Sequence, residues 1–195
     1  MIALLFHGRG SSPEKINWLT RPFREMGFQV IAPRISEVDD GYEEGLRILN
    51  NSKEPIIVGG HSMGGTVALL LSARNPDKVS CVVAVAAPVD RVLQLKWLEK
   101  SEPGSFKRSI YEDLAKLGID KLQETSPIRY IDRNHPPIIY VRGTLDDIVP
   151  EEHLNILRSK ARELGITLME LIIDGMGHTP RSSHISVISK FIKDN

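Results

Sequence analysis

Residues 56–72 read IIVGGHSMGGTVALLLS, and this stretch sets the fold that we expect for the chain. Residues 55–60 are aliphatic up to two closing glycines, which is typical of a strand covered on both faces. The run from Thr66 to Ala73 is rich in alanine and leucine and favours a helix. Ser62 stands alone among the glycines between them. The stretch therefore predicts a strand that turns sharply into a helix, with Ser62 at the turn.

Short apolar runs of the same kind recur along the chain. Besides 55–60, runs bounded by Gly or Pro lie at 2–6, 28–33, 79–88, 136–143 and 167–174. Segments of helical character separate them, at 13–26, 41–51, 63–75, 151–164 and 182–193. Alternating strands and helices are typical of a parallel sheet with right-handed crossovers. We therefore expect an α/β fold with about six mostly parallel strands and helices on both faces.

One interval is longer than an ordinary crossover. Residues 89–135 lie after the fourth strand candidate and contain helix-like pieces near 90–100 and 109–123, separated by a Ser-Glu-Pro-Gly break at 101–104. Two interpretations are open: a small cap, or a crossover helix with a decorated loop. In both cases we expect a single domain over 1–195, because this length suits one core and is short for two.

Charge and composition narrow the class of partner. The 25 Lys and Arg residues balance the 25 Asp and Glu residues, so no net charge draws the chain to nucleic acid or to an anionic membrane. Only six apolar residues precede His7, without a basic segment, so we expect neither a signal peptide nor a membrane span. The one cysteine, Cys81, excludes an intrachain disulfide and suits a reducing compartment. We expect a cytoplasmic protein that acts on a small molecule.

The turn at Ser62 has the pattern of a nucleophile elbow. A turn this sharp strains its central residue and needs small neighbours, which Gly60, Gly64 and Gly65 provide. The GHSMG segment matches the Gly-x-Ser-x-Gly motif in its required place between strand and helix. A phosphate loop would need a lysine after the glycines, and a dinucleotide fingerprint would need glycine at position 62. A purely structural turn is the remaining alternative.

A serine nucleophile needs a histidine base that an acid holds in place. Asp146 follows the fifth strand candidate and His178 follows the sixth, within glycine-rich loops. The order Ser62, Asp146, His178 is the one found in α/β hydrolases. Asp146 and Asp147 have an alternative role, as the cap and first-turn acid of the next helix.

The other histidines are weaker candidates for the base. His178 has the alternative of merely closing a glycine-rich turn, and His184 is then the second choice. We expect His61 to point away from the serine despite its place beside it in the sequence. His135 and His153 are expected on the surface.

An oxyanion needs preorganised donors, which are commonly two backbone N–H groups. We expect one from Met63, the residue after the nucleophile. The loop at 6–12, after the first strand candidate, is glycine-rich and places a second N–H, assigned to Arg9. The alternative for this loop is a tight turn in which Pro13 opens the next helix.

Taken together, these motifs resemble the α/β-hydrolase family, in particular its small serine esterases and the related lipase-like and peptidase-like hydrolases. The matching segments are His7-Gly8, Gly60 to Gly65, Gly143-Thr144-Leu145-Asp146 with Val149-Pro150, and Gly177-His178. In that family Asp-x-x-Val-Pro marks the triad acid, so the resemblance implies Asp146 rather than Asp147. Residues 126–130 (SPIRY) also look like the equivalent part of serine peptidases and acyl esterases.

Two departures from the family are visible. The usual sheet has two further N-terminal strands, whereas here the first strand candidate begins at residue 2, which implies a minimal sheet of six strands. Gly8 is followed by Arg9 rather than by the further glycines of one lipase branch, which speaks against that branch.

The resemblance implies a serine hydrolase, a carboxylesterase that cleaves esters of small or medium acyl chains through an acyl-enzyme, with no metal or organic cofactor. Thioester and peptide hydrolysis use the same machinery. An alternative of another class is a non-catalytic binding protein on a hydrolase scaffold. A dehalogenase is disfavoured, because it would normally carry an acid where Ser62 stands. Six residues of the insertion either line an acyl pocket or pack their helix: Val89, Val92, Leu93, Leu95, Trp97 and Leu98.

Overall fold

A computed structural model describes residues 1–195, and its centre is one parallel sheet of six strands. The strands stand in the order β2-β1-β3-β4-β5-β6, and every neighbouring pair is parallel. Their bounds are β1 Ile2–Phe6, β2 Gln29–Ile31, β3 Ile56–His61, β4 Val79–Val85, β5 Ile138–Gly143 and β6 Leu168–Ile173. The expected α/β fold with six strands is confirmed.

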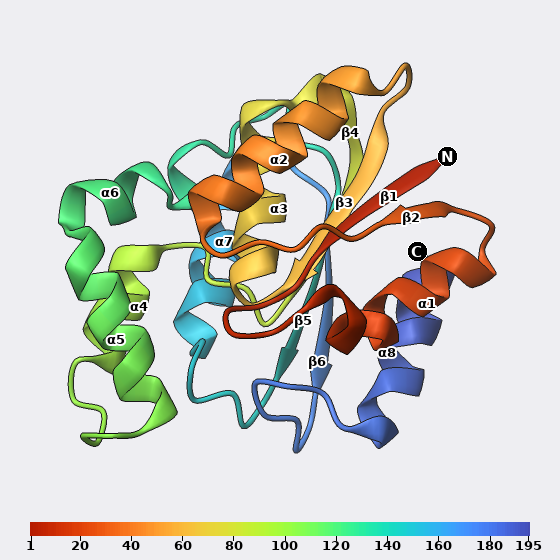
Figure 1. Ribbon diagram of the computed structural model, residues 1–195. Coiled ribbons are helices and arrows are strands. Elements are labelled where there is room, and N and C mark those ends of the chain that lie inside the picture. Colours follow the sequence, from red (N-terminus) through yellow and green to blue (C-terminus); the bar gives the residue numbers. More distant parts are fainter.

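Helices cover both faces of the sheet (Figure 1). On one face lie α1 (Asn17–Glu25), preceded by a 3₁₀ turn (Pro13–Ile16), and α8 (Ser182–Asp194). On the other face lie α2 (Val38–Asn51), α3 (Met63–Arg74) and α7 (Glu151–Leu164). Alternate strand residues face the two layers: Leu4 and Phe6 pack towards α3, while Ala3 and Leu5 pack towards α1. Each strand is therefore apolar throughout, as the sequence pattern indicated.

Two strands are shorter than their apolar runs suggested. The edge strand β2 pairs only with β1 and ends at Ile31. Strand β4 ends at Val85 because Ala86 has a positive φ of 49°, which turns the chain out of the sheet. Apolar composition alone does not mark such a turn.

The interval between β4 and β5 holds three helices, α4 (Arg91–Leu98), α5 (Phe106–Leu117) and α6 (Ile119–Glu124), and a 3₁₀ turn (Pro127–Arg129). The expected helical piece at 109–123 is two helices, because Gly118 has a φ of 81° and breaks the run. These helices have a small core of their own, which includes Leu98, Leu114 and Leu122. They lie beside the α2 and α3 layer, on the side away from the sheet (Figure 1).

The strand order reverses direction next to β1. The chain leaves β1 to form β2 on one side, and then returns to form β3 on the other side. In open parallel sheets, the crevice at such a switch point is where ligands bind, at the carboxyl ends of the strands. The loop after β1 and the turn at Ser62 both lie there.

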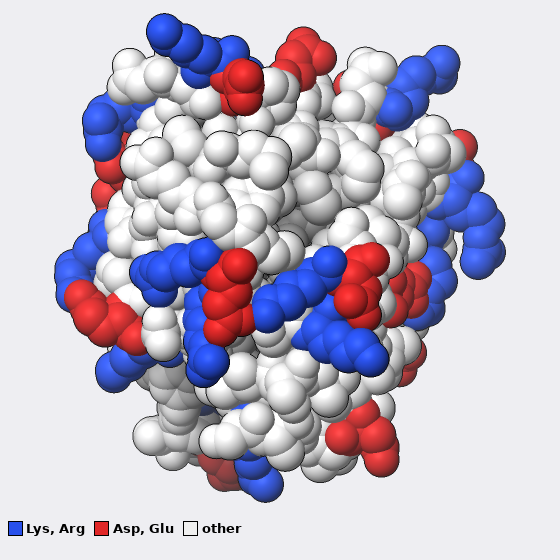
Figure 2. Space-filling view, turned by 90° about the vertical axis from the view of Figure 1, so that its right-hand side faces the viewer, with Lys and Arg blue, Asp and Glu red and all other residues white.

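On the face at the right of Figure 1, charged side chains of both signs lie beside one another across the middle and along the rim, as Figure 2 shows, in keeping with the zero net charge. None of the helices combines the length and the apolar character that crossing a membrane requires.

Candidate active site

Ser62 occupies a strained turn between β3 and α3. Its φ of 55° and ψ of −122° lie outside the regions that a residue with a side chain ordinarily adopts. Its own N–H donates to the Val85 carbonyl at 2.9 Å. A Cβ on Gly60 would overlap the Gly64 carbonyl group, and a Cβ on Gly64 would overlap the Phe6 carbonyl. The sharp turn and its need for glycine, expected from the sequence, are confirmed.

The structure brings Ser62, His178 and Asp146 together in one hydrogen-bonded row. The Nε2 atom of His178 lies 2.9 Å from the Ser62 hydroxyl oxygen. On the other side of the ring, Nδ1 lies 3.0 Å from Oδ2 and 3.1 Å from Oδ1 of Asp146. These distances are those of direct hydrogen bonds.

Asp146 is buried and fully used as an acceptor. Besides His178, its Oδ1 accepts the N–H groups of Ile148 at 3.0 Å and Val149 at 2.9 Å. Burial alone would raise the pKa of this carboxyl, but the hydrogen bond and charge of His178 and the two N–H groups outweigh it, so the pKa lies below its ordinary value. The carboxyl group is therefore ionised at neutral pH.

Neither aspartate caps the next helix, contrary to the alternative considered for them. The N-cap residue of α7 is Pro150, and the acids of its first turn are Glu151 and Glu152. Asp147 is exposed and forms an ion pair with Lys107 of α5 at 2.6 Å. The short loop after β5 places its acids before the helix begins, and the two neighbours point in different directions.

Backbone contacts between the loops after β5 and β6 set the distance between Asp146 and His178. The Leu145 N–H donates to the Met176 carbonyl at 2.9 Å. A Cβ on Gly143 would overlap that same carbonyl, so only glycine permits this approach. The glycine that ends β5 therefore serves the geometry of the site.

His61 lines the same cavity as Ser62 and makes no hydrogen bond with its hydroxyl, but it has a role that sequence reasoning missed. Its Nε2–H donates to the backbone carbonyl of His178 at 2.8 Å, and the two ring centroids lie 5.0 Å apart. Burial, and then the charge of His178, lower the pKa of His61 to about 4, so the ring is neutral at pH 7. His61 holds the loop that carries His178.

The remaining histidines lie elsewhere, and two of them correct the expectation. His184 is in the first turn of α8, where Nδ1 accepts the Arg181 N–H at 3.2 Å. The expectation that His135 and His153 lie on the surface is wrong, since both are buried. His135 lies 3.0 Å from the Ser72 hydroxyl.

His153 is buried because it satisfies backbone groups of the chain that leaves β4. Its Nδ1 accepts the N–H groups of Val89 at 3.2 Å and Asp90 at 3.4 Å, while Nε2 is buried without a partner. Burial lowers the pKa of His153 to about 4. The sequence around it gave no sign of these distant partners.

Met63 and Arg9, the expected oxyanion donors, line the same cavity as Ser62. Met63 is the first residue of α3, where a backbone N–H has no acceptor within the helix. The Arg9 N–H has no backbone acceptor in the structure. His7 fixes the loop that carries Arg9, because its Nδ1–H donates to the Gly8 carbonyl at 2.8 Å and its Nε2 accepts the Ile35 N–H at 3.1 Å.

The cavity beside Ser62 has a volume of about 230 Å³. The insertion forms one of its walls, through Arg91 and Gln94 of α4 and Phe106, Ile110 and Leu114 of α5. None of the six residues expected either in an acyl pocket or in helix packing lines this cavity. Three of them, Val92, Leu95 and Leu98, pack in the core of the insertion instead. Trp97 is half-exposed, and its Nε1–H donates to the Asp147 carbonyl at 2.9 Å. The polar face of α4, not its apolar face, turns to the cavity.

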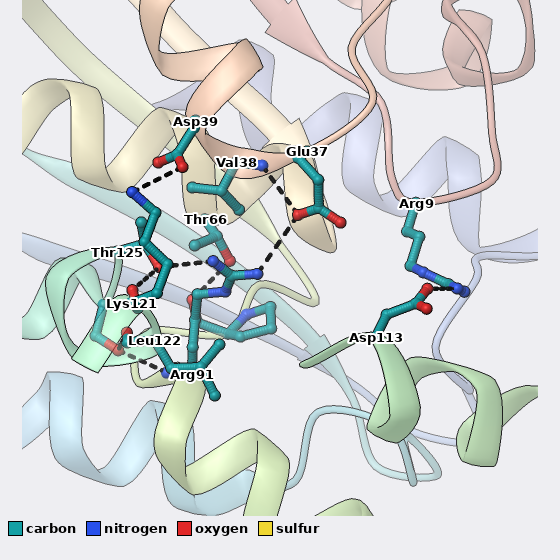
Figure 3. Close-up of polar contacts among 12 residues, drawn as sticks. Arg9, Glu37, Val38, Asp39, Thr66, Arg91, Asp113, Lys121, Leu122 and Thr125 are labelled. Atoms are coloured by element: carbon teal, nitrogen blue, oxygen red, sulfur yellow. Dashed lines mark hydrogen bonds and ion pairs between the residues drawn. The ribbon is translucent and has the colours of Figure 1, made fainter. Parts of the chain in front are cut away.

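Arg9 also connects the loop after β1 to the insertion. Its guanidinium forms an ion pair with Asp113 of α5, as Figure 3 shows. The sequence separates these two residues by more than a hundred positions, so no local pattern marks the pair.

Nowhere in the structure are three or more His, Cys, Asp or Glu side chains grouped so that they could hold a metal ion.

Several known proteins are similar to this chain. A pimeloyl-[acyl-carrier protein] methyl ester esterase of Neisseria meningitidis serogroup B / serotype 15 (strain H44/76) is 25% identical over 180 residues, which cover 72% of this chain and 68% of that protein. An esterase of Pyrobaculum calidifontis has a similar fold, with a TM-score of 0.75 at 17% identity over 100% of this chain and 77% of the other. The alpha/beta hydrolase domain-containing protein 10 from mouse has a TM-score of 0.70 at 17% identity, covering 98% of this chain and 88% of the other.

The chain therefore has the α/β-hydrolase fold, as its motifs implied. The profile of the prolyl oligopeptidase family matches residues 1–192, nearly the whole sequence. This protein belongs to the prolyl oligopeptidase family of hydrolases.

Proposed function

We propose that this protein hydrolyses carboxylic esters of small or medium acyl chains, with Ser62 as nucleophile, His178 as general base and Asp146 as the acid that orients the histidine. The observation that carries the proposal is the row of contacts from Ser62 through His178 to Asp146, at the wall of a cavity. Esterases among the similar proteins support ester as the substrate class.

The geometry accounts for both proton transfers of the reaction. Nε2 of His178 accepts the hydroxyl proton as the Ser62 oxygen bonds to the ester carbonyl carbon. The protonated ring then passes this proton to the leaving alcohol as the ester C–O bond breaks. Asp146, ionised and hydrogen-bonded to Nδ1, keeps the ring in the tautomer that leaves Nε2 able to accept, and stabilises its positive charge.

The negative charge that develops on the carbonyl oxygen needs donors on the opposite side. The N–H groups of Met63 and Arg9 are proposed for this role, because both residues line the cavity and neither N–H donates to a backbone carbonyl. Met63 also stands at the N-terminus of α3, where the helix dipole favours negative charge. In the second half of the reaction, water gives a proton to His178 as its oxygen bonds to the acyl carbon. The ring then returns this proton to the Ser62 oxygen as the bond between Ser62 and the acyl group breaks, and the acid leaves.

The size of the cavity supports a small substrate. At about 230 Å³ it lies below the roughly 300–1,000 Å³ of ordinary ligand pockets. We further propose a single domain over residues 1–195, in which residues 89–135 act as a small cap over this cavity. The ion pair between Arg9 and Asp113 supports this, since it joins α5 of the insertion to the loop after β1.

Peptide-bond hydrolysis by the same three residues is the second candidate. The match to the prolyl oligopeptidase family favours it. A panel of p-nitrophenyl esters of increasing chain length, an acyl-CoA and a dipeptide amide separates the two, because the same triad can act on an ester, a thioester or an amide and the relative rates show which of them this protein prefers.

A fluorophosphonate probe tests the nucleophile directly. The native protein should become labelled at Ser62, and the Ser62→Ala variant should lose both the label and the turnover of p-nitrophenyl butyrate. Ser11, which also lines the cavity, provides a matched control, and Ser11→Ala should keep the label. Native protein that is folded by circular dichroism and takes up no label would refute the proposed nucleophile.

A further inference from the structure

Helix α4 turns two polar side chains to the cavity beside Ser62. Arg91 and Gln94 are three positions apart, so they lie on the same face of the helix. Both line the cavity, and both are almost wholly buried, with exposed fractions of 5% and 6%. Arginine and glutamine are rarely buried to this extent without partners that use their polar atoms.

The carboxamide of Gln94 has no such partner in the protein. The only side-chain polar atoms that are both fully enclosed and unpaired are Nε of Arg142 and Nε2 of His153. The carboxamide of Gln94 makes no hydrogen bond within the protein, and its side chain lines the cavity. Its two N–H donors are therefore available to a molecule in the cavity.

The guanidinium of Arg91 is only partly used. Nη1 donates to the Thr125 hydroxyl at 2.6 Å. Nη2 lies 3.7 Å from the nearest carboxylate oxygen, on Glu37 (Figure 3), which is beyond hydrogen-bond distance. The Glu37 side chain is 42% exposed. Arg91 thus brings a buried positive charge to the cavity, with the carboxylates of Glu37 and Asp39 as its counter-charges.

Among the charged side chains that line the cavity, cations outnumber carboxylates by one. Three cationic side chains, Arg9, Lys15 and Arg91, and two carboxylates, Glu37 and Asp113, line it. Asp113 is engaged by Arg9, and Lys15 has no ion pair in the structure. An anion bound against α4 would meet the buried guanidinium of Arg91 in a partly enclosed space, where charge interactions are stronger than in water.

We propose that the preferred substrates are esters that bear a free carboxylate, such as half-esters of short dicarboxylic acids, and that Arg91 and Gln94 bind this carboxylate. A carboxylate accepts hydrogen bonds from both groups, and arginine binds it with particular strength. This inference rests on the proposed function, since it names the substrate class of the same site. The ester group then lies at Ser62 while the carboxylate lies against α4.

Pairs of substrates with equal shape and different charge test the proposal. Monomethyl glutarate is compared with methyl 5-methylhexanoate, in which an isopropyl group replaces the carboxylate of the acyl part. The acetate ester of 4-hydroxybutanoate is compared with 4-methylpentyl acetate, which places the difference in the alcohol part. We expect that in at least one pair the anionic ester has a kcat/KM about tenfold or more above that of its neutral partner. One charge-assisted hydrogen bond is enough for a difference of this size.

Variants of α4 assign that preference to its residues. Gln94→Leu keeps the volume of the side chain and removes the donors, so the anionic-to-neutral ratio of kcat/KM should fall about tenfold. Gln94→Glu should lower it further by repulsion. Arg91→Met should abolish the preference. If loss of the hydrogen bond to Thr125 unfolds the Arg91→Met variant, the two Gln94 variants still test the proposal. Lys96→Gln, on the exposed face of the same helix, is the matched control and should keep the native ratio.

The outcomes separate this inference from the proposed function. Equal kcat/KM within both pairs, in a protein that turns over esters and takes the fluorophosphonate label, would overturn the carboxylate preference and leave the ester hydrolase standing. A preference that survives in Gln94→Leu and Gln94→Glu would overturn the role of α4. Absence of any turnover together with absence of labelling would instead refute the proposed function.

Discussion

Replacing Asp146 by asparagine changes one atom of the candidate site and leaves its shape almost unaltered. In the structure Oδ1 accepts two backbone N–H groups, from Ile148 and Val149, at 3.0 and 2.9 Å. Oδ2 has only His178 as its partner, at 3.0 Å. The asparagine must keep its oxygen at the first position, because an NH₂ group there would face two donors. Its NH₂ group therefore faces Nδ1 of His178.

This orientation reverses the tautomer of the histidine. An NH₂ donor at Nδ1 requires Nδ1 to accept, so the ring proton moves to Nε2, which lies 2.9 Å from the Ser62 hydroxyl. Nε2 then no longer accepts the serine proton. We expect a fall of about 10⁴-fold in kcat, which corresponds to about 5.5 kcal/mol of transition-state stabilisation.

The assay is steady-state hydrolysis of p-nitrophenyl butyrate, with folding checked by circular dichroism. The matched control is Asp147→Asn in the same loop, which loses only an exposed ion pair with Lys107 and should retain activity within a few-fold. An Asp146→Asn enzyme within tenfold of the native rate would refute the reasoning. So would a loss in Asp147→Asn as large as the loss in Asp146→Asn.

Three further predictions concern residues around the site. The pKa of His153 in the fold, about 4, lies below the ordinary 6.5, so the unfolded chain binds the extra proton between these values and stability is lost as the pH falls. His153 alone should account for a loss of about 3 kcal/mol between pH 7 and pH 4, measured in urea unfolding as the amount by which the loss in the native protein exceeds the loss in His153→Gln. Gly64→Ala places a Cβ against the Phe6 carbonyl and should lower the free energy of unfolding by about 3 kcal/mol, and a value within about 0.5 kcal/mol of the native protein would contradict the close approach. His61→Phe keeps an aromatic ring but removes the donor to the His178 carbonyl, so kcat should fall about tenfold with KM unchanged, and equal effects on kcat and KM would argue against a role in positioning the loop.

The sequence alone determined the order of the strands along the chain and the position of the catalytic candidates at their ends. Parallel strands buried on both faces are continuously apolar, and this property is local, so Ile56–His61 and Ile138–Gly143 were recognisable without any partner. The turn at Ser62 was equally local, because its glycines are adjacent in the sequence. Since the carboxyl ends of parallel strands meet at one edge, Asp146 and His178 followed from the same pattern.

Only the tertiary structure decided which side chains surround the serine. Three contacts join residues that are distant in the sequence: His153 with the Val89 N–H, His61 with the His178 carbonyl, and Arg9 with Asp113. The orientation of α4 is of the same kind. Its apolar and polar residues are both present in the sequence, but the face that meets the cavity depends on packing against the loop at Ile148 and Val149. Local patterns are set by the periodicity of one element, whereas a cavity is lined by several elements at once, so its chemistry appears only when they are packed together.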